Sequence, residues 1–289
     1  MILVTGATGN LGKAILNELQ KQNPDTKITA MIRDKKKAED LASLNLEIVE
    51  ASYDDKNSLL QAFNGVDKLV FISGNADTET RIKQHQNVVE AAAESGVKQV
   101  YYTSFSNPVP ETKFSFTFAH TATEKLIRES GLNYTFLRNA LYADLLIGSA
   151  QEAAKTGKIT TASANGKVGY IPRFEIAAAI AAVVLSDKYV NQSLELANNK
   201  LYSYLDIAEI LSKILGRTVT LNLVSTKAIE KVYSGMGFPQ FLAEGLASSF
   251  DAIEDNEYDF STDDFKKITG RNPIDLAGFL ESAKSYFLN

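Results

Sequence analysis

The chain lacks cysteine entirely and carries only two histidines, His85 and His120, in 289 residues. Without cysteine it cannot form disulfides, thiol nucleophiles or thiolate metal sites. Two histidines are also too few for a multi-histidine metal centre. We therefore expect no metal, and a cysteine-free chain fits the reducing environment of the cytoplasm.

An excess of basic residues and a long apolar run are missing as well. The formal net charge is −5, which disfavours nucleic acid as a partner, because binding a polyanion needs a basic field. No stretch is apolar over the length of a membrane span, and the residues after Met1 do not resemble a signal peptide. We expect a soluble globular protein with neither a nucleic-acid nor a membrane partner.

Short apolar runs alternate with amphipathic stretches through the first half of the chain. The expected strands cover residues 1–6, 27–33, 46–51, 68–73, 99–104 and 134–139. Continuous apolar runs are typical of parallel strands that are covered on both faces. Between them, stretches such as 11–22 and 81–96 place apolar residues at helical spacing. This alternation predicts an α/β fold with a doubly wound parallel sheet of the Rossmann type.

The order of elements changes after Asn139. Helices are expected at 141–155, 174–186 and 204–216, and strands at 194–198 and 218–225. The sequence therefore predicts a dinucleotide-binding Rossmann domain over residues 1–140 plus about 165–192. A smaller C-terminal α/β substrate-binding lobe would cover about 141–164 plus 193–289.

The stretch VTGATGNLGKAIL, residues 4–16, is the strongest local signal. A strand leads into Gly6, Gly9 and Gly12, and a helix follows. The glycines permit a tight turn, a close approach of the backbone to a pyrophosphate, and close packing of helix on strand. The N-terminus of the helix offers free N–H groups to an anion. The alternative is a glycine-rich turn without a ligand, but the strand-turn-helix context favours dinucleotide binding.

The second expected strand ends in Met31-Ile32-Arg33-Asp34. Enzymes that use the non-phosphorylated cofactor place an acidic residue here to bind the ribose hydroxyls, whereas an arginine can pair with a 2′-phosphate. The run Lys35–Lys37 follows and adds positive charge. We therefore favour NADPH over NADH; the alternative, with Asp34 adjacent, is that Arg33 is an ordinary surface arginine.

Several segments resemble the atypical short-chain dehydrogenase/reductase group with an NmrA-like NAD(P)-binding domain. They are VTGATGNLG (4–12), KLVFISG (68–74), QHQNVVEAAAESGVKQVYYTS (84–104), YTFLRNALYADL (134–145) and TDDFKKITGRNP (262–273). Within that group, the chain is most similar to NADPH-dependent quinone oxidoreductases and triphenylmethane reductases. The likeness spans nearly the whole chain, and YTFLRNALY is its most specific piece.

The resemblance implies roles for particular residues. Gly6, Ala7, Thr8, Gly9, Asn10 and Leu11 would surround the pyrophosphate, Arg33 would bind the 2′-phosphate, and Ile72, Ser73 and Gly74 would lie by the adjacent ribose. Arg138 and Asn139 would contact the cofactor at its nicotinamide end, where Asn139 and Tyr142 would also meet the acceptor. Each role has an alternative: Ser73 and Gly74 as a simple strand end, Arg138 as a structural ion-pair partner, and Tyr142 as part of the core.

FAHTATEK, residues 118–125, departs from the wider superfamily, in which a Tyr-x-x-x-Lys pair exchanges the substrate proton. Thr121 stands where that tyrosine is expected, and no tyrosine in the chain has a lysine four residues later. Sugar epimerisation and alcohol oxidation therefore lose their base, whereas quinones and cationic dyes accept hydride readily. His120 is a candidate for a late proton transfer or a structural histidine. Lys125 is a candidate ribose ligand or a solvated lysine.

Together with the resemblance, these residues predict an NADPH-dependent oxidoreductase that passes hydride directly to a quinone-like or triphenylmethane-dye-like acceptor, without flavin. The alternative is a redox-sensing regulator of the NmrA-like type, which binds NAD(P) and performs no chemistry.

Ser52 stands where many relatives carry an acidic residue near the adenine, and Asp54 is a candidate substitute. A homodimer is compatible with such a chain, and no sequence pattern fixes the oligomeric state.

Overall fold

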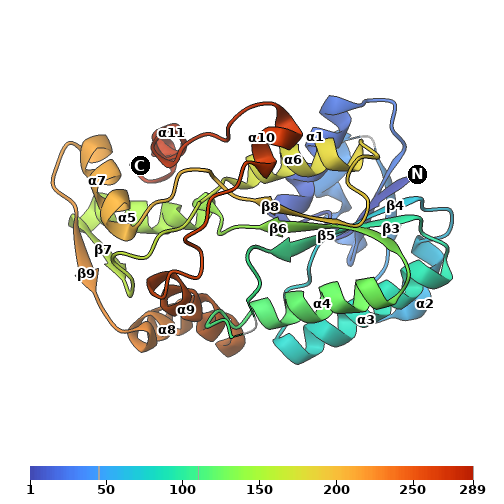
Figure 1. Ribbon diagram of the computed structural model, residues 1–289, viewed down its shortest axis with the longest axis horizontal. Helices are drawn as coiled ribbons and strands as arrows, with labels where there is room; N and C mark the ends of the chain where they lie inside the picture. Colours follow the sequence, from blue (N-terminus) through green and yellow to red (C-terminus); the bar gives the residue numbers. More distant parts are fainter. Residues whose placement is uncertain (45, 110, 289) are drawn as a thin grey trace. The chain divides into compact units, whose positions relative to one another are not determined.

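Seven strands form the main sheet, in the order β3 (Glu47–Glu50), β2 (Ile28–Ile32), β1 (Ile2–Val4), β4 (Lys68–Phe71), β5 (Gln99–Phe105), β6 (Asn133–Asn139) and β8 (Gln192–Leu196). This computed structural model describes residues 1–44, 46–109 and 111–288 (Figure 1). The pairs β1–β2, β1–β4, β2–β3 and β4–β5 are parallel. All six strands expected in the first half of the chain are present.

The strand order reverses at β1, which lies between β2 and β4. In such sheets, ligands bind outside the carboxyl ends of the strands at the point of reversal. Every residue of β1, β2 and β5 is buried, which explains why their sequences are mostly apolar. The doubly wound α/β fold predicted from the sequence is confirmed.

Helices cover both faces of this sheet (Figure 1). On one face, α1 (Asn10–Gln22) packs against α6 (Arg173–Val184). On the other face lie α2 (Lys56–Ala62), α3 (Thr78–Glu94) and α4 (Thr117–Glu129), with α2 packed against α3. The 3-10 segment η1 (Lys35–Leu44) follows β2. Phe71, Val88 and Tyr102 are fully buried in one core cluster that joins the sheet to α3.

The chain divides into two compact units. The second unit contains α5 (Leu146–Thr156), α7 (Tyr204–Leu215), α8 (Thr226–Gly235), α9 (Gln240–Glu254), α10 (Asp264–Thr269) and α11 (Leu276–Ser282), with the 3-10 segments η2 (Ala143–Leu145) and η3 (Lys284–Tyr286). Its strands β7 (Lys158–Thr161) and β9 (Thr220–Leu223) pair in parallel. The helix expected at 204–216 begins with a capping box at Ser203 and ends at Gly216 in the left-handed conformation, so its sequence signals match its bounds.

The first unit comprises residues 1–105, 118–138 and 173–194, and the second comprises 106–117, 139–172 and 195–289. These ranges differ from the predicted domains mainly at 106–117, which belongs to the second unit. The reason is hydrogen bonding to a distant part of the chain, because the Asn107 side chain donates to the Glu257 carbonyl oxygen at 2.6 Å. The segment 165–172 also belongs there, since Val168 forms an antiparallel bridge with Tyr202. Strand β8, assigned to the smaller lobe from the sequence, instead forms an edge of the seven-stranded sheet.

Candidate functional site

The turn after β1 requires glycine at two positions. Gly6 has a φ of +58°, in the left-handed region, and a Cβ there would lie 3.3 Å from the Cβ of Ile72. A Cβ on Gly12 would lie 2.3 Å from the Gly6 carbonyl oxygen, which no real structure tolerates. The Gly9 N–H donates to the same carbonyl at 3.0 Å. The glycines therefore allow the turn to close tightly and let α1 begin directly against it.

The N-terminus of α1 carries no protein anion. Gly9 is the N-cap residue and provides no side-chain hydrogen bond, and the first turn contains no acidic residue. Asn10 is the exposed first residue of the helix, whereas Ala7 and Leu11 are buried beside the turn. The N–H groups of the first turn and the positive end of the helix dipole are thus left for an external anion.

A cavity of about 350 Å³ lies over the carboxyl ends of β1, β2 and β4. It is lined by Gly6, Thr8, Gly9, Met31, Ile32, Arg33, Lys37, Tyr53, Asp54, Ile72, Ser73, Gly74, Asn75 and Gln84. This volume lies at the lower end of the range of small-molecule pockets, enough for part of a dinucleotide. Seven of the predicted cofactor residues are therefore brought together in a single cavity of the first unit.

Two cations line this cavity. Arg33 and Lys37 are exposed, and neither side chain makes a hydrogen bond or ion pair with another residue in the described part of the chain. Asp54 is the carboxylate in the cavity, and it accepts a hydrogen bond from the Gln84 side chain at 2.9 Å. The side chain of Lys35, the first residue of the basic run, lies outside the described residues. The cavity thus combines an available positive charge with a helix N-terminus.

Tyr53 connects the two central strands beneath the cavity. Its hydroxyl donates to the Ile72 carbonyl oxygen at 2.7 Å and also contacts the Thr5 hydroxyl. Burial raises the pKa of Tyr53 well above its ordinary value, so the phenol stays protonated and keeps both contacts. Tyr53, Asn75 and Gln84 also line the cavity, and no sequence motif pointed to them.

Asn139 has the most unusual environment of the predicted residues. Its side chain is 2% exposed, and within the described part of the chain neither its amide oxygen nor its amide nitrogen has a hydrogen-bond partner. A buried polar group without a partner costs on the order of 1–3 kcal/mol, and such groups in native structures call for an explanation. A ligand that supplies both a hydrogen-bond donor and an acceptor to this amide is a direct explanation.

Arg138 adjoins Asn139 on β6 but is held by a carboxylate. Its Nε donates to Glu124 at 2.9 Å and its terminal nitrogen donates to the other carboxylate oxygen at 2.8 Å. Glu124 is buried and also accepts from Ser104 at 2.7 Å and Arg128 at 2.9 Å. Glu124 is thus the ion-pair partner expected if Arg138 has the structural role that the sequence left as an alternative. The cofactor role of Arg138 stays a prediction.

His120 is half-buried on α4, and its Nδ1 lies 2.9 Å from the Tyr102 hydroxyl. Burial lowers the pKa of His120 to about 3, with a further contribution from the nearby Arg81 cation, so the ring is neutral at pH 7. Tyr142 is half-buried in the second unit, where it caps η2 and forms a bridge with Ile171. The catalytic roles of His120 and Tyr142 stay predictions.

The helix face that carries the proton donor in the wider superfamily is exposed here. Thr121 is exposed on α4. Lys125 is exposed as well, and its ammonium group contacts both oxygens of Glu129, at 2.6 and 2.8 Å. This ion pair favours the solvated-lysine alternative for Lys125 over the ribose ligand.

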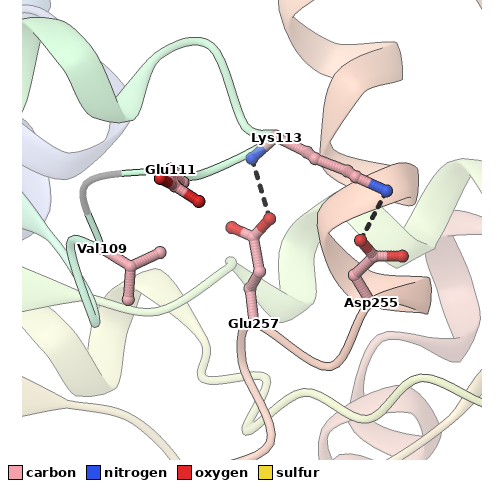
Figure 2. A pocket seen from close by; sticks show the side chains of 5 residues that line it. All are labelled: Val109, Glu111, Lys113, Asp255 and Glu257. Carbon is pink, nitrogen blue, oxygen red and sulfur yellow. Dashed lines mark hydrogen bonds and ion pairs between the residues drawn. The ribbon is translucent and has the colours of Figure 1, made fainter.

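Figure 2 shows another cavity, in the second unit, lined by Val109, Glu111, Lys113, Asp255 and Glu257. The Lys113 backbone N–H donates to Glu257 at 2.8 Å, and its ammonium group pairs with Asp255 at 2.5 Å. These contacts hold the segment 106–117 to the end of α9. None of the predicted site residues lines this cavity.

No group of three or more metal-binding side chains is found among residues 1–44, 46–109 and 111–288. Within the same ranges, every helix is too short or too polar to cross a membrane.

Comparison with known proteins identifies the family. The model of the NmrA-like family matches residues 1–284. The chain belongs to the NmrA-like family. This NmrA-like chain is 34% identical to quinone oxidoreductase 2 of Escherichia coli (strain K12) over 249 residues, which cover 86% of each chain.

Solved structures of NmrA-like proteins agree with this assignment. The Citrobacter sp. triphenylmethane reductase complexed with NADP(H) has a TM-score of 0.91 and 36% identity, covering 99% of this chain and 100% of that one. The E. coli NADPH-dependent quinone oxidoreductase complexed with NADPH has a TM-score of 0.91 and 32% identity, with the same coverage. Both neighbours were solved with a phosphorylated nicotinamide cofactor bound.

Proposed function

We propose that this chain is an NADPH-dependent oxidoreductase that transfers hydride directly to a quinone-like or triphenylmethane-dye-like acceptor, without flavin. The observation that carries the proposal is the cavity at the ends of β1, β2 and β4. There an uncapped helix N-terminus lies together with two cations that have no ion-pair partner among the described residues. The names of the relatives, which include a quinone oxidoreductase and a triphenylmethane reductase, support the same reaction class.

The residues present fit NADPH at this cavity. The first turn of α1 offers N–H groups to the pyrophosphate, and the close contact of Gly12 with Gly6 keeps side chains out of its way. Arg33 and Lys37 offer a guanidinium and an ammonium group to the 2′-phosphate. Asp54, held by Gln84, offers a carboxylate to the amino group of an adenine.

Asn139 is the residue that we propose contacts the reacting, nicotinamide end of the cofactor. NADPH supplies a hydride, which goes to an electron-poor carbon of the acceptor. The orphaned amide of Asn139 has the donor and acceptor that a carboxamide or a carbonyl substrate needs. Its burial excludes water, so a hydrogen bond made there is stronger than one at the surface.

A strong general acid is not needed for such acceptors. Proton donation contributes roughly 10²–10⁴-fold where it matters, and orientation of the reactants supplies much of the remaining acceleration. His120 is neutral at pH 7, so it has no imidazolium proton to give to the acceptor. The final proton on a reduced quinone then comes from solvent.

The test follows NADPH absorbance with flavin-free protein and a panel of quinones and triphenylmethane dyes. Turnover that is lost in Asn139→Leu and reduced in Tyr142→Phe supports the enzyme. The rival function, a redox sensor without chemistry, predicts tight NADPH binding and no oxidation with any acceptor of the panel. Turnover that requires added flavin would contradict direct hydride transfer.

A further inference from the structure

The wall of the nucleotide cavity after β4 is held by buried side chains. The strand ends at Phe71, so the next three backbone N–H groups leave the ladder of the sheet. The Ile72 N–H donates to Thr5 Oγ1 at 2.9 Å, and the Ser73 N–H donates to Thr103 Oγ1 at 3.0 Å. The Gly74 N–H donates to His85 Nε2 at 2.9 Å. Three buried side chains thus define the position of three consecutive residues that line the cavity.

His85 differs from the two threonines because its ring can carry its proton on either nitrogen. A backbone N–H can only donate, so Nε2 must be the unprotonated nitrogen of a neutral imidazole. The proton then lies on Nδ1, which is 2.7 Å from Thr123 Oγ1. The Thr123 hydroxyl in turn donates to the Ala119 carbonyl oxygen at 2.7 Å. Each donor in this chain has one acceptor, so the Gly74 N–H on one side of the ring and the Thr123 hydroxyl of α4 on the other select the same tautomer.

The surroundings of His85 favour the neutral ring. It is completely buried and packs edge-on against Phe71, with ring centroids 4.8 Å apart, and against Tyr102 at 5.8 Å. Tyr53, Arg81 and His120 are the other titratable groups near the ring. Burial, followed by the charges of His120 and Arg81, lowers the pKa of His85 well below its ordinary value.

We propose that His85 is a positioning residue for the cofactor, fixed by Thr123 as the Nδ1-protonated tautomer so that its Nε2 holds the Gly74 backbone in the nucleotide cavity. This inference rests on the proposed NADPH site. The opposite tautomer would point a donor at the Gly74 N–H, and residues 72–74 would lose one of their three anchors. The structure thereby links the packing of α4, which does not line the cavity, to the affinity for the nucleotide.

The experiment compares Thr123→Val with the matched variant Thr123→Ser. Valine keeps the shape of threonine but removes the acceptor for Nδ1–H, whereas serine keeps the hydroxyl. Calorimetric titration with NADPH is expected to give about tenfold weaker binding for Thr123→Val and wild-type binding for Thr123→Ser. Equal affinity of all three proteins would overturn the proposal.

A spectroscopic readout does not depend on NADPH. Labelling with ¹⁵N-histidine gives signals from only two imidazoles, because His85 and His120 are the only histidines in the chain. We expect His85 to carry its proton on Nδ1 in the wild type and in Thr123→Ser, and to populate the other tautomer in Thr123→Val. A wild-type His85 protonated on Nε2 would contradict the inference even if NADPH binds.

A second pair of variants covers the case in which Thr123→Val fails to fold. His85→Gln places an amide that can accept from the Gly74 N–H, and His85→Leu cannot. The glutamine variant is expected to bind NADPH within about threefold of the wild type, and the leucine variant about tenfold more weakly. Equal binding by the two would refute the positioning role. A wild type that binds no NADPH would instead refute the proposed function and leave the tautomer measurement to decide on His85.

Discussion

At the scale of single residues, the nucleotide cavity contains two cationic side chains that have no ion-pair partner among the described residues, which favours the binding of a phosphate. Arg33 and Lys37 face the same cavity and make no ion pair with a described residue. Surface cations of this chain elsewhere often have partners, as Lys125 has Glu129 and Lys227 has Glu230. An unpaired arginine keeps its bidentate donor geometry free for a 2′-phosphate.

The variant Arg33→Asp should lose the preference for the phosphorylated cofactor. Charge-assisted hydrogen bonds contribute about 1.5–3 kcal/mol each, so NADPH affinity should fall on the order of 10- to 100-fold, while NADH affinity changes little or improves. Titration of the purified variant with each nucleotide measures both. Lys188→Asp, an equal charge change at an exposed site outside the cavity, should leave both affinities unchanged.

The second residue-scale prediction separates function from stability at Asn139. Replacing its unpartnered amide by leucine removes a buried polar group without breaking a hydrogen bond of its side chain. Asn139→Leu should therefore keep or raise the free energy of unfolding, by up to about 1–2 kcal/mol, while turnover of NADPH with quinones is lost. Urea denaturation and steady-state kinetics on the same preparation give the two values.

Asn198 is the matched control, since it is equally buried but fully engaged. Its amide nitrogen donates to the Ile274 carbonyl oxygen at 2.8 Å, and its oxygen accepts from the Lys200 N–H at 3.2 Å. Asn198→Leu should lower the free energy of unfolding by about 1–3 kcal/mol. If Asn139→Leu destabilises as much as Asn198→Leu, the amide of Asn139 is structural and its proposed role is wrong.

At the scale of elements, the turn from β1 into α1 depends on the missing side chain of Gly12. An added Cβ would lie 2.3 Å from the Gly6 oxygen and 2.9 Å from the Ala7 Cα, both backbone atoms that cannot move without opening the turn. Gly12→Ala should lower the affinity for NADPH at least tenfold and should also destabilise the fold, by about 1–3 kcal/mol of overpacking strain. Nucleotide titration and thermal unfolding measure these effects.

Gly148 on α5 provides the comparison with an ordinary helical glycine. A Cβ there would meet nothing within 4 Å. Gly148→Ala should therefore stabilise the protein by up to about 1 kcal/mol, through helix propensity alone, and should bind NADPH like the wild type. Loss of nucleotide affinity in both variants would show that the effect of Gly12→Ala is not local to the turn.

Sequence patterns predicted elements well where one physical rule decides the structure. Strands that are buried on both faces are rich in apolar residues, so β1, β2 and β5 could be found from their apolar runs. Strand β8 was found but assigned to the smaller lobe, since strand pairing is non-local and leaves no mark in QSLEL. The segment 106–117 could not be assigned to its unit, because its partner Glu257 lies far along the chain.

The motif residues of the candidate site could be predicted from the sequence, but the residues that hold them in position could not. The glycine turn and Arg33 follow from local geometry. Tyr53 acts through its contacts with Thr5 and Ile72, which only the fold brings together. His85 left a signal that could have been read, since it shares a buried helical stripe with Val88, Val89 and Ala92. A histidine on an apolar stripe needs partners for its ring nitrogens, which predicts a buried polar network.

At the scale of the whole molecule, the two histidines make the free energy of unfolding depend on pH. This dependence falls at higher pH than the range in which carboxylates titrate. Burial holds the pKa of His120 at about 3 and lowers that of His85 well below 6.5. The unfolded chain therefore binds more protons than the folded chain below pH 6.5, so stability is fully present above that pH and falls as the solution is acidified.

The free energy of unfolding should fall by about 2 kcal/mol between pH 7.0 and 5.5, with each histidine contributing roughly half. Urea denaturation at both pH values measures the change. His120→Gln should show about half the wild-type dependence, because only His85 then remains to take up a proton on unfolding. A variant with the full wild-type dependence would show that other groups titrate in this range.

The most direct measurement is calorimetric titration of the nucleotide-free protein with NADPH and with NADH. Saturable binding to one site is expected for NADPH, with NADH bound at least about tenfold more weakly because it lacks the phosphate that Arg33 and Lys37 would hold. Equal affinities would contradict the role of the two cations. No saturable binding of either nucleotide would contradict the assignment of the cavity itself.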